Sequence, residues 1–145
     1  MTMTDLNQPE LEKQLEQALK LIQSGEQEKG DQLIQKIAAE HPDHYLSLYG
    51  LGLIAAFMGN HDKAKHYFEQ SITIEPEYAL AHYNLGFCHQ KLNQIDLMIK
   101  HFYLALQTAT DEELELLEHV DEAIKEFSDN LPAGITMQSF LKGIN

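Results

Sequence analysis

The chain has 145 residues, of which 43% are hydrophobic, so it has enough apolar side chains to build one domain around a buried core. The formal net charge is −13, and this argues against nucleic acid or an anionic membrane as a partner, because both require clustered positive charge. No apolar run reaches the roughly 20 residues of a membrane-spanning helix, the N-terminus lacks the pattern of a secretory signal, and the single cysteine cannot form an internal disulfide, so we expect a cytoplasmic protein.

Along the chain, residues 1–10 form a polar N-terminal segment, and a repeat of 34 residues follows it. The repeat is defined by identical residues at this offset: Pro42 and Pro76, Tyr49 and Tyr83, Leu51 and Leu85, Gly52 and Gly86, and Phe68 and Phe102. The period predicts three repeats, residues 11–44, 45–78 and 79–112.

Each repeat is expected to form a hairpin of two α-helices. In the middle repeat, the first helix should run from Tyr45 to Met58 and end at Gly59, because glycine adopts the left-handed conformation that closes a helix. The second helix should run from Asp62 to Ile74, and Pro76 interrupts the chain after it. The equivalent turns of the other two repeats are expected at Gly25 and Asn93.

A capping helix is expected after the repeats, over residues 113–130. Thr110 and Glu113 are spaced as a capping box at its start. An apolar stripe at helical spacing should cover the end of the third repeat: Leu114, Leu117, Val120, Ile124 and Phe127. Residues 131–145 form a tail with a possible short helix, in which Phe140 and Leu141 should pack on the repeats or on a second copy.

The middle repeat resembles the tetratricopeptide repeat. The residues that carry the resemblance are Leu48, Leu51, Gly52, Ala55, Ala64, Phe68, Ser71 and Pro76. The resemblance implies an all-α fold: a right-handed α-solenoid of three helical hairpins with a capping helix, in which Gly52 and Gly86 lie at close helix crossings. It also implies a protein-binding function rather than an enzyme, with no cofactor. The third repeat departs from the pattern at His82, His89, Met98 and Thr110.

In that family a second apolar face of each first helix lines a concave groove. The corresponding residues are Leu15 and Leu19 in the first repeat, Leu46, Tyr49 and Leu53 in the second, and Leu80, Tyr83, Asn84 and Phe87 in the third. So large an apolar surface is rarely left open in a lone protein. A ligand peptide, the tail or a second copy should therefore cover it, unless the same residues simply pack against neighbouring helices.

The expected partner is thus a peptide or a segment of another protein, and the expected role is that of an adaptor or a chaperone. The apolar, tyrosine-lined groove resembles that of the small three-repeat chaperones that hold secreted translocator proteins in bacteria. Other family members clamp a terminal carboxylate with basic residues and asparagine, and of the matching positions here only Asn84 fits. The alternative is a structural homodimer that uses the same groove.

Catalytic chemistry has little support in the sequence. There is no glycine-rich phosphate loop, and Cys88 and the histidines His82 and His89 are expected to be packed inside the fold, so a metal- or thiol-dependent activity is a weaker alternative. His41 and His44 flank a turn and should be solvated. The acidic run from Asp111 to Asp129 is either a solvated face or a docking strip for a basic partner.

Overall fold

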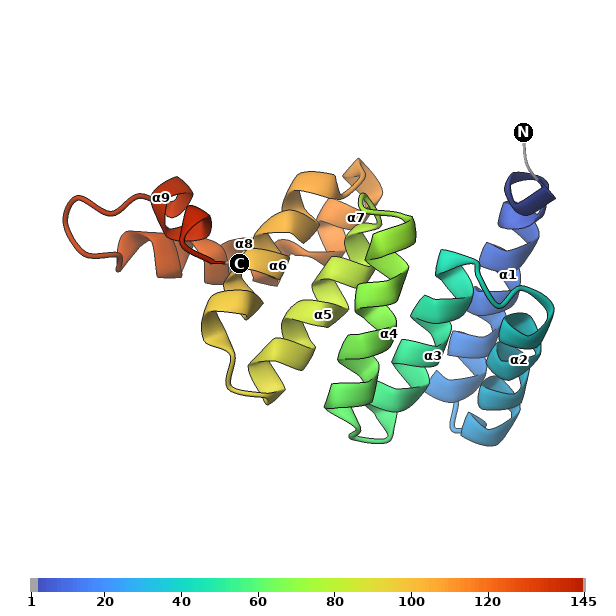
Figure 1. Cartoon of the computed structure of the whole chain (residues 1–145). Helices are drawn as coiled ribbons and strands as arrows, with labels where there is room; N and C mark the ends of the chain where they lie inside the picture. The colour runs from blue at the N-terminus through green and yellow to red at the C-terminus, as the bar shows by residue number, and fades with distance from the viewer. Residues whose placement is uncertain (1–2, 145) are drawn as a thin grey trace. The chain divides into compact units, whose positions relative to one another are not determined.

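The computed structural model of the protein describes residues 3–144, and within them the ordered elements are all α-helices, as the sequence predicts (Figure 1). The helices belong to two compact units, Met1–Pro76 and Glu77–Asn145. The first unit contains α1 (Met3–Gln23), α2 (Gln27–Glu40), α3 (Tyr45–Phe57) and α4 (His61–Ile74). The second unit contains α5 (Ala79–Lys91), α6 (Ile95–Thr108), α7 (Asp111–Leu116), α8 (Glu118–Asp129) and α9 (Met137–Lys142).

Three pairs of helices form hairpins, α1 with α2, α3 with α4, and α5 with α6, and one type of turn closes all three. Each turn has a residue with positive φ at the same place in the 34-residue period: Gly25 at 93°, Gly59 at 79° and Asn93 at 60°. The next amide then donates to a carbonyl five residues back: Glu26 to Leu21, Asn60 to Ala55 and Gln94 to His89. This hydrogen bond belongs to the Schellman motif, which requires the left-handed residue, so the glycines and Asn93 end the first helices.

The two helices of a hairpin cross closely where a glycine faces a phenylalanine. A Cβ atom on Gly52 of α3 would lie 2.6 Å from the ring of Phe68 on α4, and Phe68 is fully buried. One period later, Gly86 of α5 faces Phe102 of α6 in the same way. The close crossings predicted at both glycines are confirmed. In each hairpin, the phenylalanine ring fills the space that a side chain on the glycine would occupy.

All four helices of the first unit contribute to its core, and α3 is buried on more than one face. Its buried apolar side chains are Leu11, Leu15, Ala18, Ile34, Ile37, Leu46, Tyr49, Leu53, Ala55, Ala64 and Phe68. Ser71 of α4 adds a polar tie, because its hydroxyl donates to the carbonyl of Tyr45 at 3.0 Å. Residues 3–10, which the sequence analysis separates from the first repeat, continue α1 through Pro9. A proline removes a single backbone donor, and the segment around it contains good helix formers.

The capping segment is two helices rather than the single helix expected over residues 113–130. The capping box at Thr110 and Glu113 forms as predicted and starts α7. The helix is interrupted at Leu117, whose N–H donates to the carbonyls of both Glu113 and Leu114 at 3.1 Å, so the last turn tightens before α8 begins. Leu117 is fully buried, whereas Leu114, one turn earlier, stays 41% exposed. The apolar stripe therefore starts at Leu117.

One hydrophobic core cluster of the second unit lies between α6 and α8, which contribute Ile99, Phe102, Val120 and Ile124. The tail helix α9 lies beside α8 and packs Met137 and Phe140 against this core (Figure 1). The rings of Phe127 and Phe140 lie 4.9 Å apart. The tail thus docks on its own chain through Phe140, and both Phe140 and Leu141 are half-buried.

None of the described helices combines the length and the apolar character that crossing a membrane requires.

Candidate partner-binding surfaces

In the first unit, most of the side chains expected to contact a partner lie in the core. Leu15, Leu46, Tyr49 and Leu53 are buried, and only Leu19 is half-buried. The ring of Tyr49 packs 5.6 Å from that of Phe68. The chain itself therefore buries these four residues, which is the alternative that the sequence analysis left open. The sequence periodicity identifies the face on which they lie but does not reveal how far the chain covers it.

In the second unit, the four expected residues of α5 are all half-buried, and we call them the α5 face: Leu80, Tyr83, Asn84 and Phe87. The rings of Tyr83 and Phe87 meet edge to face at 4.8 Å. His119 of α8 packs on both, and its Nε2 lies 2.8 Å from the Tyr83 hydroxyl. The capping helix therefore covers part of this aromatic face, and burial raises the pKa of the Tyr83 phenol, which keeps it neutral.

Asn84 is the polar member of the α5 face. Its Nδ2 donates to the carbonyl of Leu80 at 2.9 Å, one helical turn earlier. The Asn84 side chain was expected to bond a partner backbone, and here it donates a hydrogen bond within its own helix. His119 was not anticipated from the sequence, because it lies 36 residues from Tyr83 and outside the repeat period.

The helices α5 and α6 enclose a stack of three imidazoles. The ring of His101 on α6 lies between those of His82 and His89 on α5, at centroid distances of 5.5 and 5.1 Å. The two α5 histidines are buried, as predicted. His101 was missed, although it shares a helix face with Met98 and Ala105, and that spacing could have placed it inside the hairpin.

Hydrogen bonds orient the stack. The Nδ1 atoms of His82 and His101 lie 3.3 Å apart, and Nδ1 of His89 lies 2.8 Å from the side-chain oxygen of Gln94. Burial, together with the charges that His89, His82 and Lys100 would bring, lowers the pKa of His101 to about 3. His101, at the centre of the stack, is therefore neutral at physiological pH. Among the described residues, no group of three or more histidine, cysteine or acidic side chains is arranged to hold a metal ion.

Cys88 and His44, which the sequence analysis considered for their chemistry, are both buried and have structural positions. Cys88 is buried in α5, as expected. His44 was expected to be solvated, but it is buried, stacks on Tyr45 and accepts a hydrogen bond from the amide of Leu46. It is the N-cap of α3, and a histidine nitrogen satisfies a helix-end donor there in place of the usual hydroxyl or carboxylate.

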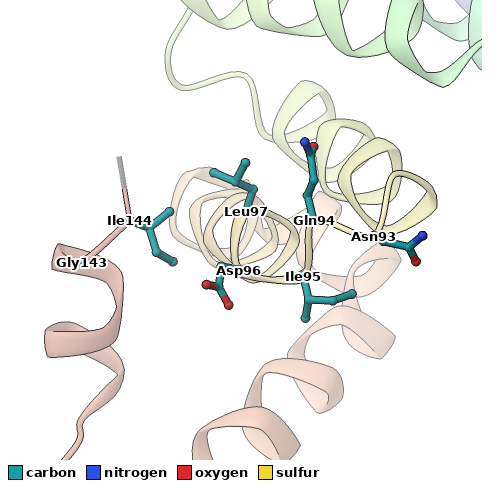
Figure 2. A pocket seen from close by; sticks show the side chains of 7 residues that line it. All are labelled: Asn93, Gln94, Ile95, Asp96, Leu97, Gly143 and Ile144. Atoms are coloured by element: carbon teal, nitrogen blue, oxygen red, sulfur yellow. The ribbon is translucent and has the colours of Figure 1, made fainter.

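Two open hollows lie on the described part of the second unit. One, of about 550 Å³, lies between the start of α6 and the end of the tail. Figure 2 shows that Ile144 points towards Leu97 and Asp96, while Asn93, Gln94 and Ile95 point in other directions. Its polar groups do not converge on one point, which a specific small-molecule site needs.

The other hollow, of about 500 Å³, lies beside α7 and α8. We call it the acidic recess, and its lining residues are Leu106, Leu114, Glu115, Glu118 and Asp121. It lies within the acidic run that the sequence analysis identified as a solvated face or a docking strip.

The sequence of residues 45–78, which form α3 and α4, matches the family model described as tetratricopeptide repeat. No curated protein sequence matches the chain significantly. Solved structures do. The type III secretion translocator chaperone SycD of Yersinia enterocolitica, in a form described as an alternative dimer, has a TM-score of 0.69 and 19% identity over 83% of this chain and 95% of its own.

SycD in complex with a peptide of the translocator YopD has a TM-score of 0.63 and 20% identity, over 82% of this chain and 95% of its own. The TPR domain of Sgt2 from Aspergillus fumigatus has a TM-score of 0.61 and 19% identity, over 88% of this chain and 89% of its own. At such identities the likeness establishes the fold.

Proposed function

We propose that this chain, which has the tetratricopeptide repeat fold and matches that family's model over residues 45–78, binds a peptide or an extended segment of another protein. The observation that carries the proposal is the α5 face, on which Leu80, Tyr83 and Phe87 are only half-buried. Full burial of a large apolar side chain is worth roughly 1.5–3 kcal/mol, so a partner that completes the burial of these side chains is held there.

The similarity to SycD supports a chaperone-like form of this function, because one SycD structure contains a peptide of a translocator. On the α5 face we assign apolar contacts to Leu80, Tyr83 and Phe87, and a hydrogen bond to the partner backbone to Asn84. In the first unit we assign direct contact to the half-buried Leu19 alone, because Leu15, Leu46, Tyr49 and Leu53 are buried.

A photo-crosslinking amino acid at position 80 tests the proposal in the cells that make this protein. We expect irradiation to join the chain to a discrete partner that mass spectrometry identifies. The purified partner should then bind the purified chain, and Leu80→Asp should weaken that binding about tenfold or more, because it places a charge in an apolar contact.

Position 74 is the matched control, because Ile74 is an apolar residue that is 49% exposed on the second helix of a hairpin. The cross-linker at position 74 should give no partner, and Ile74→Asp should leave the affinity unchanged. Identical products at the two positions, or an affinity that Leu80→Asp does not alter, would contradict the proposal.

Homodimerisation is the second candidate, and one exposed apolar site favours it. Phe57 and Met58, at the end of α3, are 53% and 72% exposed. One of the similar SycD structures is also described as a dimer. Sedimentation velocity at several concentrations separates the candidates. A sedimentation coefficient that rises with concentration, and that Phe57→Asp makes constant, would favour the dimer, whereas a constant value in the unchanged chain favours partner binding.

A further inference from the structure

We propose that the acidic recess beside α7 and α8 holds a lysine or arginine side chain from a basic amphipathic segment of the partner protein. This inference rests on the proposed function, because it supplies a chemical class for the partner. It concerns a surface separate from the α5 face, built by residues of α6, α7 and α8.

The recess combines two kinds of lining. Leu106 of α6 and Leu114 of α7 supply an apolar wall, and Leu114 is 41% exposed although it is a large apolar residue. Glu115, Glu118 and Asp121 supply three carboxylates around the same hollow. The interruption at Leu117 separates α7 from α8 at this place, so Leu114 and Glu115 of α7 border the same space as the carboxylates of α8.

The carboxylates of the recess have little positive charge nearby. Asp121 pairs with Lys125 at 3.1 Å, and both side chains are substantially exposed. Within the described residues, the ion pairs of the structure leave out Glu115 and Glu118. The run from Asp111 to Asp129 contains nine carboxylates and Lys125 as its single basic residue. A cation from outside the chain is therefore attracted to this surface.

The lining distinguishes among cations. A hydrated metal ion gains nothing from two leucines, and among the described residues no metal-binding group of three ligands is found. Lysine and arginine have apolar stems that lie along apolar surface while the charged head reaches a carboxylate. Leucines on the same face of the partner segment would cover Leu114. The recess therefore fits a basic amphipathic segment better than a free ion or a purely polar cation.

Binding of a defined probe to the full chain tests the inference. The probe is a fluorescein-labelled amphipathic peptide of leucine and lysine, and its affinity is measured by fluorescence anisotropy. Replacing the recess carboxylates, by Glu115→Gln, Glu118→Gln and Asp121→Asn together, should weaken binding about tenfold or more. Leu114→Ser should weaken it about threefold or more, because Leu114 is exposed and its loss removes the apolar contact without disturbing the core.

A second triple variant controls for total charge. Glu122→Gln, Glu126→Gln and Asp129→Asn remove the same charge from α8 outside the recess, and together they should change the affinity less than about threefold. Equal losses in the two triple variants would mean diffuse attraction and would overturn the inference. So would competition by spermine as effective as that by unlabelled peptide, because spermine has the charge without the leucines.

The same variants separate this inference from the proposed function. If a partner identified through position 80 binds the recess triple variant as tightly as the unchanged chain, then the inference fails and the proposed function stands. If the probe binds in the recess as described while position 80 yields no partner, then the proposed function fails and the recess remains a binding site for basic segments.

Discussion

His82 and His101 share a hydrogen bond between their Nδ1 atoms, which lie 3.3 Å apart between α5 and α6. One ring must donate and the other must accept, so at most one of these two nitrogens can hold a proton while the contact is intact. Protonation of both rings would place two N–H groups and two positive charges against each other. The contact therefore requires at least one of the two rings to be neutral.

The first prediction is that mild acid destabilises the chain through His101. Its pKa is lowered to about 3 in the fold, against 6.5 for an ordinary histidine. Between these values the unfolded chain binds the extra proton, so the stabilisation is complete above about pH 6.5 and is lost as the pH falls towards 3. One such group changes the free energy of unfolding by at most about 1.4 kcal/mol per pH unit. Thermal melts from pH 7.5 to 5, followed by circular dichroism, measure the slope.

His101→Gln should flatten that slope, because glutamine does not titrate. His66→Gln is the matched control, because His66 is exposed and its replacement should leave the slope unchanged. If His101→Gln retains the full dependence on pH, then the stack is not its source.

The second prediction is that Gly52→Ala destabilises the chain, against the usual preference of helices. In an open helix this change is worth about 1 kcal/mol of stabilisation. Here the new methyl group meets the ring of Phe68, which is fully buried and cannot withdraw, so we expect a net loss of about 1–3 kcal/mol in urea unfolding. Gly143→Ala is the control, because its nearest contact would lie at an ordinary 3.5 Å.

Combining Gly52→Ala with Phe68→Leu should cost less than the sum of the two single changes, since the smaller side chain makes room for the methyl group. Strict additivity would mean that the two residues do not touch, and the close crossing would then be refuted.

The third prediction concerns the turn at Asn93. Asn93 has a left-handed backbone, with φ of 60°. The equivalent position is Gly25 in the first hairpin and Gly59 in the second. Asn93→Gly should raise the melting temperature slightly, because glycine adopts this conformation without steric cost. Asn93→Val should lower the stability by about 1–2 kcal/mol, because the branched side chain opposes a left-handed residue. A valine variant as stable as the unchanged chain would contradict the assigned turn.

The fourth prediction concerns the tail. Phe140 packs on Phe127 and on the core between α6 and α8, so Phe140→Ala should destabilise the chain by about 1–2 kcal/mol, less than for a fully buried ring. It should also increase the fluorescence of a dye that binds exposed apolar surface. Ile135→Ala, at a residue that is 45% exposed, is the control and should change neither quantity. A tail that is mobile by NMR in the unchanged chain would rule out this packing.

Features that repeat at one spacing could be predicted without coordinates. The turns at Gly25, Gly59 and Asn93 and the crossings at Gly52 and Gly86 depend on properties of single residues: a left-handed backbone, or the absence of a side chain. The capping box at Thr110 is equally local, since both of its hydrogen bonds join residues three apart. Helical spacing also predicts which residues share a face, and hence the burial of His82 and His89.

Contacts between helices could not be predicted in the same way. Spacing places Tyr49 and Tyr83 on equivalent faces, yet Tyr49 is buried while Tyr83 is half-buried under His119 of α8. The break at Leu117 and the exposure of Leu114 likewise have no local signal in the sequence.

The sequence by itself therefore determined the helical hairpins, their turns and their tight glycine crossings, because those depend on interactions within one helix or one repeated pair of helices. Only the tertiary structure decided which apolar faces the chain covers, where three histidines stack, and that leucines and carboxylates border a common recess. These features require side chains from different helices to approach within a few ångströms, and the periodicity of a single helix contains no information about its neighbour.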